Sequence, residues 1–272
     1  MSRNLRTAVF MHGLESGPGG SKHRWLESYL GGGVTATADR HNTSCDTSPP
    51  PSKPLLSDSD RGHTIDCPDM QVSLWRPDKF NGFGVQLALN LLSGWPTTLC
   101  SRAMQSSLDR CLAAQARALD SFRPAPSGAA GNPSVSIAVS PALVVASSWG
   151  GAIATLALAT GLWSGPTVLL APAYSKALRF AGGPATVDRA PERIFAAIRN
   201  RLTDEQRSRI VIIHGTADTV VPFEDSEEFA DAAGVELIAV AGGDHRLNDF
   251  VLDNNGSGRP GLLQVTIDRV LL

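Results

Sequence analysis

The sequence has almost no excess of charge of either sign. Its 272 residues include 24 Lys and Arg against 26 Asp and Glu, so the formal net charge is -2. Proteins that bind nucleic acid, an anionic membrane surface or a polyacid usually show a marked charge imbalance. We therefore expect none of these partners.

Paired cysteines are also lacking. The four cysteines, Cys45, Cys67, Cys100 and Cys111, stand at irregular spacing with no Cys-x-x-Cys pair, so neither a zinc site nor a disulfide framework is indicated. No two of the six histidines have the i, i+4 spacing of a helical metal site. We expect reduced cysteines, no metal and no cofactor.

Long apolar segments are the third absence. The opening residues MSRNLRTAVF lack the apolar stretch of roughly 7 to 15 residues that a secretory signal needs. The longest uncharged stretch, residues 124–175, contains prolines, glycines and the polar letters SSWGG, which make it a poor membrane span. The expected location is therefore the cytoplasm.

Hydrophobic residues make up 42% of the chain, enough for the core of one large domain over residues 1–272. Two segments depart from this composition. Residues 34–66 are rich in Ser, Thr, Asp and Pro, and residues 124–134 are rich in Pro, Gly, Ala and Ser. The first is predicted to be a disordered insertion and the second a loop.

Short apolar runs alternate with helical patterns along the rest of the chain. Strands are predicted at Thr7–Met11, Met70–Trp75, Ala142–Ala146, Thr167–Leu170, Ile210–Ile213 and Val235–Val240. Helices are predicted from Ser21, over Met104–Leu119, and at Gly151–Thr160, Pro191–Arg207, Glu224–Ala233 and Pro260–Leu272. This order predicts an α/β fold, a three-layer α/β/α sandwich with a mostly parallel central sheet, whose ligands bind beyond the carboxyl ends of the strands.

The strand that ends near Ala146 leads into SSWGG, the pattern of a nucleophile elbow. This sharp turn tolerates only small side chains two positions before and after the nucleophile. With Ser148 as nucleophile those positions are Ala146 and Gly150, whereas with Ser147 they would be Val145 and Trp149. Sterics therefore favour Ser148.

A serine hydroxyl needs a base to take its proton, and the base needs an acid to hold its tautomer. On this kind of sheet the chain order is Ser, acid, His, and His245 is the one histidine that lies beyond the candidate acids following Ser148. Asp218, in the turn after a strand, is favoured as the acid over a set of carboxylates placed elsewhere: Asp188, Asp204, Asp225, Asp231 and Asp244.

Attack on a carbonyl creates an oxyanion, and each fixed N–H donor that stabilises it is worth roughly 3 to 4 kcal/mol. The backbone N–H groups of Trp149 and Leu14 are the expected donors. His12 and Gly13 are expected to orient the loop that carries Leu14, with His12 acting through a hydrogen bond. His214 has the same structural interpretation.

Other patterns have two interpretations. The letters ESGPGGSK suggest a phosphate loop, but the spacing fails because Ser or Thr does not follow the lysine, so a structural turn is favoured. Trp149 and Trp163 could line an acyl pocket or pack in the core, and packing is favoured for Tyr174. The charged residues 191–209 could bind a partner, but mixed signs favour a solvated helix.

These motifs together resemble the α/β-hydrolase superfamily, and within it the small esterases with little or no cap. The resemblance rests on HGLESGPGGSKHRWL, PDMQVSLW, SSWGGAIA, HGTADTVVP and GGDHRL, and it covers nearly all the chain outside the two unusual segments. It implies hydrolysis of a carboxylic ester or a related acyl bond without a cofactor.

The expected function is therefore that of a serine hydrolase whose partner is a small acyl ester. Residues 171–210 leave room for only a short excursion, which predicts a shallow, open pocket suited to small acyl groups. The alternative is a non-catalytic protein of the same fold that binds a ligand or a partner. The natural substrate and the oligomeric state stay open.

Overall fold

The computed structural model describes residues 7–13, 20–30, 64–66, 97–120, 142–180, 182–183, 186–252 and 260–272. Its centre is a six-stranded sheet in the order β2-β1-β3-β4-β5-β6, in which every pairing is parallel. The strands are β1 (Thr7–Met11), β2 (Thr64–Asp66), β3 (Ala142–Ser147), β4 (Thr167–Leu170), β5 (Ile210–Gly215) and β6 (Glu236–Val240).

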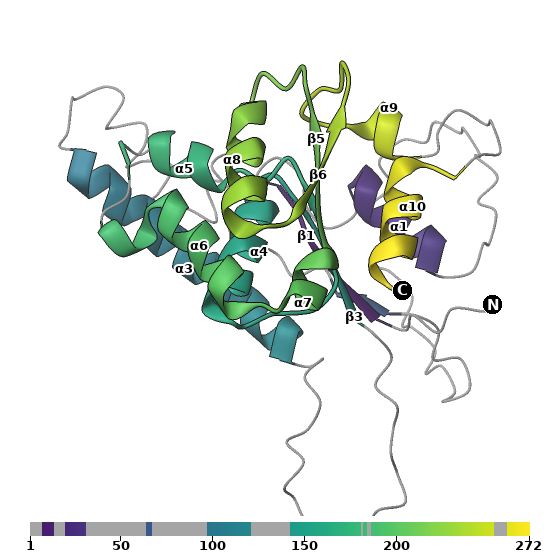
Figure 1. The fold of residues 1–272 in the computed structure, drawn as a ribbon, viewed down its shortest axis with the longest axis horizontal. Coiled ribbons are helices and arrows are strands. Elements are labelled where there is room, and N and C mark those ends of the chain that lie inside the picture. Colours follow the sequence, from purple (N-terminus) through teal and green to yellow (C-terminus); the bar gives the residue numbers. More distant parts are fainter. Residues whose placement is uncertain are drawn as a thin grey trace, which may run out of the picture.

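Helices cover both faces of this sheet (Figure 1). One face carries α3 (Thr97–Asp120), α4 (Trp149–Thr160), α5 (Tyr174–Phe180), α6 (Pro191–Arg201) and α8 (Phe223–Ala233), and the other carries α1 (Ser21–Leu30), α9 (Asn248–Val251) and α10 (Leu262–Val270). Two further short helices are the 3-10 turn η3 (Val187–Arg189) and α7 (Asp204–Ser208). The predicted three-layer α/β/α sandwich is confirmed.

The apolar character of the strands follows from burial on two sides. Within β1, Val9 and Met11 belong to the core under α3 and α4, while Ala8 and Phe10 belong to the core under α1 and α10. Strands covered on both faces lose the polar alternation of half-exposed strands. The edge strand β6, by contrast, leaves Glu236 exposed.

The helix α4 is buried along almost its whole length, which explains its near absence of polar residues. Every residue from Trp149 to Ala159 is buried, and the helix ends at Gly161 in the left-handed conformation, with φ 76°. A glycine adopts this conformation without the steric penalty that other residues meet.

Several predicted elements need correction. Residues 64–66 were assigned to the disordered insertion but form β2, paired in register with β1. The expected helix Pro191–Arg207 is two helices, because Leu202 is extended and Thr203 begins α7 with a capping box to Gln206. The helices α5 and α9 and the turn η3 were not predicted.

Some predictions fall outside the described residues. These are the rest of the insertion, residues 34–63, the loop at 124–134 and the strand at Met70–Trp75. Among the described residues, no helix is both long enough and apolar enough to cross a membrane.

Candidate active site

The turn between β3 and α4 holds Ser148 in an unusual backbone conformation. Its φ is 54° and its ψ is -115°, so it is one of three non-glycine residues with positive φ in the part of the chain that is described. Such conformations cost about 1 to 3 kcal/mol and persist only where surrounding structure enforces them. This is the sharp strand-to-helix turn expected of an elbow.

Close packing enforces the turn. A Cβ atom added to Gly150 would lie 2.0 Å from the carbonyl oxygen of Met11, so the first turn of α4 sits directly against the end of β1. The N–H of Ser148 donates to the carbonyl of Leu170 at 2.8 Å, which ties the elbow to β4. The small residue predicted at position 150 is therefore a requirement of backbone packing.

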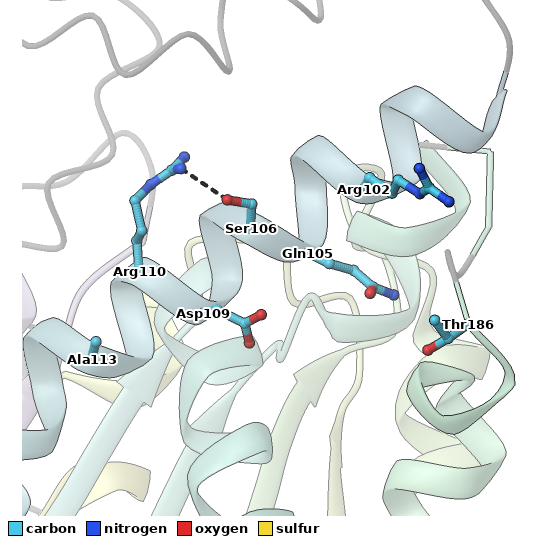
Figure 2. A pocket seen from close by; sticks show the side chains of 7 residues that line it. All are labelled: Arg102, Gln105, Ser106, Asp109, Arg110, Ala113 and Thr186. Atoms are coloured by element: carbon cyan, nitrogen blue, oxygen red, sulfur yellow. Dashed lines mark hydrogen bonds between the residues drawn. The ribbon is translucent and has the colours of Figure 1, made fainter.

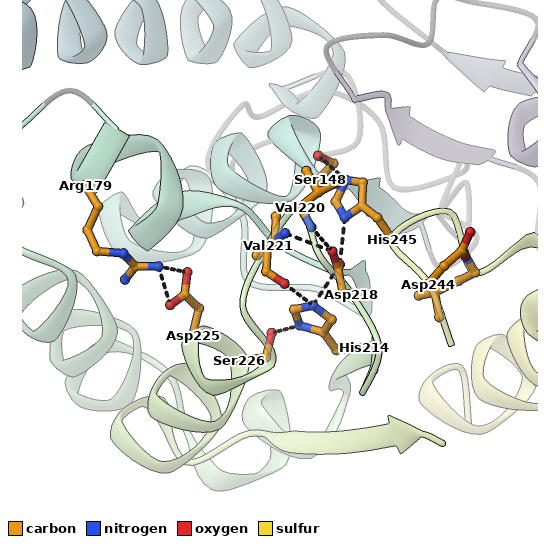
Figure 3. Close-up of polar contacts among 11 residues, drawn as sticks. Ser148, Arg179, His214, Asp218, Val220, Val221, Asp225, Ser226, Asp244 and His245 are labelled. Carbon is orange, nitrogen blue, oxygen red and sulfur yellow. Dashed lines mark hydrogen bonds and ion pairs between the residues drawn. The ribbon is translucent and has the colours of Figure 1, made fainter. Parts of the chain in front are cut away.

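Ser148, Asp218 and His245 form one chain of hydrogen bonds (Figure 3). Nδ1 of His245 lies 2.7 Å from Oδ2 of Asp218, and Nε2 of the same ring lies 3.0 Å from Oγ of Ser148. The contact falls on Ser148, as the steric argument predicted, while its neighbour Ser147 is the last residue of β3. Three residues separated by up to 97 positions thus meet at the carboxyl edge of the sheet.

The turns that follow β5 and β6 bring the acid and the histidine together. The N–H of Ala217 donates to the carbonyl of Gly243 at 3.0 Å. A Cβ atom on Gly215 would lie 2.1 Å from that same carbonyl oxygen, so the two turns approach as closely as two backbones can. Glycines at both positions make the contact between Asp218 and His245 possible.

The carboxylate of Asp218 is fully buried and accepts four hydrogen bonds. Its Oδ1 accepts from the backbone N–H groups of Val220 at 2.7 Å and Val221 at 2.9 Å, and its Oδ2 lies near His245 and near Nε2 of His214, at 3.0 Å. Burial raises the pKa of Asp218, but the hydrogen bonds from His214, His245 and Val221, together with the charge interaction with His245, lower it more, so the pKa lies well below its usual value. The group is an anion at neutral pH.

His214 binds the carboxylate of Asp218, which goes beyond the structural hydrogen bond that the sequence predicts for it. A signal was present, since His214 stands four residues before Asp218, near the end of the strand that leads to it. Asp244, one of the alternative acids, instead accepts a hydrogen bond from the N–H of Leu247 at 2.8 Å. Asp225 pairs with Arg179.

Of the two expected oxyanion donors, the described residues include Trp149 but not Leu14. Trp149 is the first residue of α4, so its backbone N–H lies at the positive end of the helix dipole, beside Ser148. Leu14 lies outside the described residues. His12 is buried, and its Nδ1 lies 2.8 Å from the carbonyl oxygen of Gly13, a hydrogen bond within the loop that it was predicted to orient.

The aromatic side chains considered for an acyl pocket pack instead. The Trp149 indole is 2% exposed, and its N–H donates to the Cys111 thiol at 3.5 Å. The Trp163 indole donates to the Thr167 hydroxyl at 2.9 Å, at the start of β4 and away from the carboxyl edge. The favoured interpretation of Tyr174 is confirmed, because it is buried and its hydroxyl donates to the carbonyl of Arg189.

The start of α1 lies close to the turn that carries His245. The pKa of Lys22 is lowered to about 8, mainly by burial. The Arg246 guanidinium also lowers it, while the Asp244 carboxylate partly opposes the shift. The charges of Asp244 and Arg246, on either side of His245, thus act on the lysine of the glycine-rich segment.

A separate pocket of about 520 Å³ opens over α3 (Figure 2). It is lined by Arg102, Gln105, Ser106, Asp109, Arg110, Ala113 and Thr186. An ion pair from Arg189 to Asp109, 2.8 Å long, joins η3 to this helix. The charged lining differs from what an acyl chain requires, and the pocket includes no member of the hydrogen-bonded chain.

Searches against protein-family models and curated proteins give no match. Solved structures do resemble the chain. One is described as a putative hydrolase of the α/β superfamily from Xanthomonas campestris, with 18% identity over 97% of this chain and 95% of that one and a TM-score of 0.45.

Two other similar structures are Est1E from Butyrivibrio proteoclasticus with ferulic acid bound and a dienelactone hydrolase from Anabaena variabilis. The first is 13% identical over 97% of this chain and 86% of its own, with a TM-score of 0.47. The second is 12% identical over 98% and 86%, with a TM-score of 0.46. These likenesses are loose, so the case for an active site depends on the geometry of the residues themselves.

Proposed function

We propose that the protein is a serine hydrolase that cleaves a carboxylic ester or a related acyl bond, such as a thioester, through an acyl-enzyme intermediate. The observation that carries this proposal is the hydrogen-bonded chain from Asp218 through His245 to Ser148, at 2.7 and 3.0 Å. A buried anion, an imidazole that it orients and a hydroxyl in a strained turn are the parts that this chemistry needs.

In the first step, Oγ of Ser148 attacks the acyl carbon while Nε2 of His245 takes the hydroxyl proton. The new C–O bond gives a tetrahedral oxyanion, which the N–H of Trp149 and, as predicted from the sequence, that of Leu14 would stabilise. The intermediate collapses when His245 returns the proton to the leaving oxygen or sulfur. The alcohol or thiol departs and leaves the acyl group on Ser148.

In the second step, His245 removes a proton from water, which attacks the acyl carbon. Collapse of the second oxyanion releases the carboxylic acid and returns the proton to Ser148. Throughout both steps the anionic Asp218 stabilises the charged imidazole and keeps Nδ1 protonated, so that Nε2 points at the serine.

The test is covalent labelling with a fluorophosphonate probe, read together with hydrolysis of p-nitrophenyl acetate. Ser148→Ala should abolish labelling and lower kcat by about 10⁶-fold, with an unchanged melting temperature within about 2 °C. The matched control is Ser147→Ala at the neighbouring serine, which should keep both activities. Labelling that survives in Ser148→Ala would favour the non-catalytic, ligand-binding alternative.

We propose further that the acyl group of the substrate is small or flexible. Between β4 and β5 the described residues form α5, η3, α6 and α7, of which the longest has 11 residues, and this is consistent with a shallow pocket and with small or flexible acyl groups. A series of p-nitrophenyl esters from acetate to palmitate tests this directly. A kcat/KM that rises towards the long chains would contradict the preference for small acyl groups while leaving the hydrolase proposal intact.

A further inference from the structure

His214, in the strand β5, lies beneath the carboxylate of Asp218 (Figure 3). Its imidazole has no exposed surface. Nε2 lies 3.0 Å from Oδ2 of Asp218 and 3.1 Å from the carbonyl oxygen of Val221. Both neighbours are acceptors only, so Nε2 must carry a proton and donate to them.

The other ring nitrogen has a partner that completes this assignment. Nδ1 lies 2.6 Å from Oγ of Ser226, on α8. A hydroxyl can donate as well as accept, and in a neutral imidazole with the proton on Nε2 the Nδ1 atom is an acceptor. Ser226 therefore donates to Nδ1 and keeps the donor side of His214 turned towards Asp218.

The bond from His214 falls on the oxygen that the reaction uses. The backbone donors Val220 and Val221 both hold Oδ1, and they alone would leave the carboxylate free to swing Oδ2 about that contact. His214 fixes Oδ2, the same atom that accepts from Nδ1 of His245. Anchoring both oxygens sets the plane of the carboxylate, and with it the direction in which His245 is held.

We propose that His214 is a positioning residue for catalysis, which holds Oδ2 of Asp218 in line with His245, and that Ser226 sets the tautomer needed for this. The inference depends on the proposed hydrolase function. It differs from a packing role in one respect: the hydrogen-bond donor at Nε2, rather than the volume of the ring, should determine the rate.

Two substitutions test whether the rate depends on the hydrogen-bond donor at Nε2 of His214 or on the volume of its ring. His214→Leu removes the donor, and His214→Gln places an amide N–H near the position of Nε2. Small displacements of catalytic groups can lower rates about 100-fold, so we expect His214→Leu to lower kcat by about 10- to 100-fold with KM changed less than about twofold. His214→Gln should recover most of that loss.

Ser226→Ala tests the tautomer and has a matched control on the same helix. Asp225, one residue earlier, is buried and pairs with Arg179 of α5 without touching Asp218 or His214 (Figure 3). Ser226→Ala should lower kcat by about 3- to 10-fold, whereas Asp225→Asn should leave kcat unchanged even if it lowers the melting temperature.

The experiment measures kcat and KM for p-nitrophenyl acetate, with active sites counted by fluorophosphonate labelling so that unfolded protein does not contribute. Folded His214→Leu with a kcat within threefold of the wild type would overturn the inference, as would His214→Gln that is no faster than His214→Leu. If His214→Leu does not fold, equal kcat values for Ser226→Ala and Asp225→Asn overturn it instead.

The controls also distinguish this inference from the proposed function. A wild-type protein that neither hydrolyses esters nor labels at Ser148 would refute both. A wild type that is active, with Ser148→Ala inactive and His214→Leu unimpaired, would refute the role of His214 alone.

Discussion

The turn after β3 and the turn after β5 each present a side chain to the same crevice, but they hold it by different means. Ser148 is positioned by its backbone, in a left-handed conformation packed so tightly that Gly150 has no room for a Cβ atom. Asp218 is positioned by hydrogen bonds to both carboxylate oxygens. Changes at Gly150, which packs beneath the first turn, should therefore affect folding first, whereas changes at Asp218 should affect catalysis first.

After loss of the Ser148 hydroxyl itself, the greatest loss of activity should come from breaking the hydrogen bonds of Asp218. Asp218→Asn should lower kcat about 10⁴-fold, because the amide cannot hold the reactive tautomer of His245. The matched control is Asp244→Asn, next to His245 but bonded to the N–H of Leu247, which should keep kcat within about threefold. Ester hydrolysis by both purified variants checks this. A similar loss of kcat in both variants would contradict the assignment of Asp218 as the catalytic acid.

Breaking the packed turn should instead destabilise the protein. A Cβ atom on Gly150 would lie 2.0 Å from the Met11 carbonyl oxygen, so Gly150→Ala should lower the free energy of unfolding by about 3 kcal/mol or more. Gly242 has φ 70° with nothing within 4 Å of an added Cβ atom, so Gly242→Ala should cost about 1 kcal/mol. Urea denaturation gives both values. Equal losses would argue against close backbone packing as the cause.

The hydrogen bonds of Asp218 should also make the stability of the protein depend on pH. The pKa of Asp218 is lower in the folded protein than its unfolded value of about 3.9. Its contribution to stability is therefore complete above that pH and is lost as the pH falls further and the folded carboxylate becomes protonated. Between pH 6 and pH 2 the wild type should lose about 2 to 3 kcal/mol more stability than Asp218→Asn. Parallel urea-denaturation curves for the two proteins would contradict this.

The smallest effect concerns the residue after the nucleophile. Trp149 acts in the proposed mechanism only through its backbone N–H, while its indole is buried against Cys111. Trp149→Phe should therefore cost about 1 to 2 kcal/mol of stability and leave kcat/KM for p-nitrophenyl acetate within about twofold. Trp163→Phe, which loses a similar indole contact away from the site, is the control. A tenfold change confined to Trp149→Phe would indicate that the indole contacts substrate.

The positions of Ser148, Asp218 and His245 could be predicted because each follows an apolar strand. Parallel strands bring their carboxyl ends to one edge of a sheet, so the chain order of the strand ends restricts which side chains can meet. Small residues around Ser148 then distinguished it from Ser147 by sterics alone. The structure places His245 within hydrogen-bond distance of both Ser148 and Asp218.

Other features depend on contacts that no local pattern contains. The indole of Trp149 turns towards Cys111, 38 residues earlier, and its direction is decided by how α3 packs on α4. The role of His214 as a second partner of Asp218 could not be predicted either. It depends on Ser226 of α8, which contacts the other nitrogen of the His214 ring. The pairing of residues 64–66 with β1 was likewise hidden by a polar composition that indicated disorder.

The strain at Ser148 also has a consequence for how this chain could change over time. A left-handed backbone at this position suits glycine better than serine, so Ser148→Gly would relax the turn while removing the reactive hydroxyl. This single substitution would therefore both stabilise the turn and remove the proposed activity. Under the proposed function, only selection for catalysis would retain serine at this strained position, so the identity of residue 148 would indicate whether a related chain keeps the proposed activity.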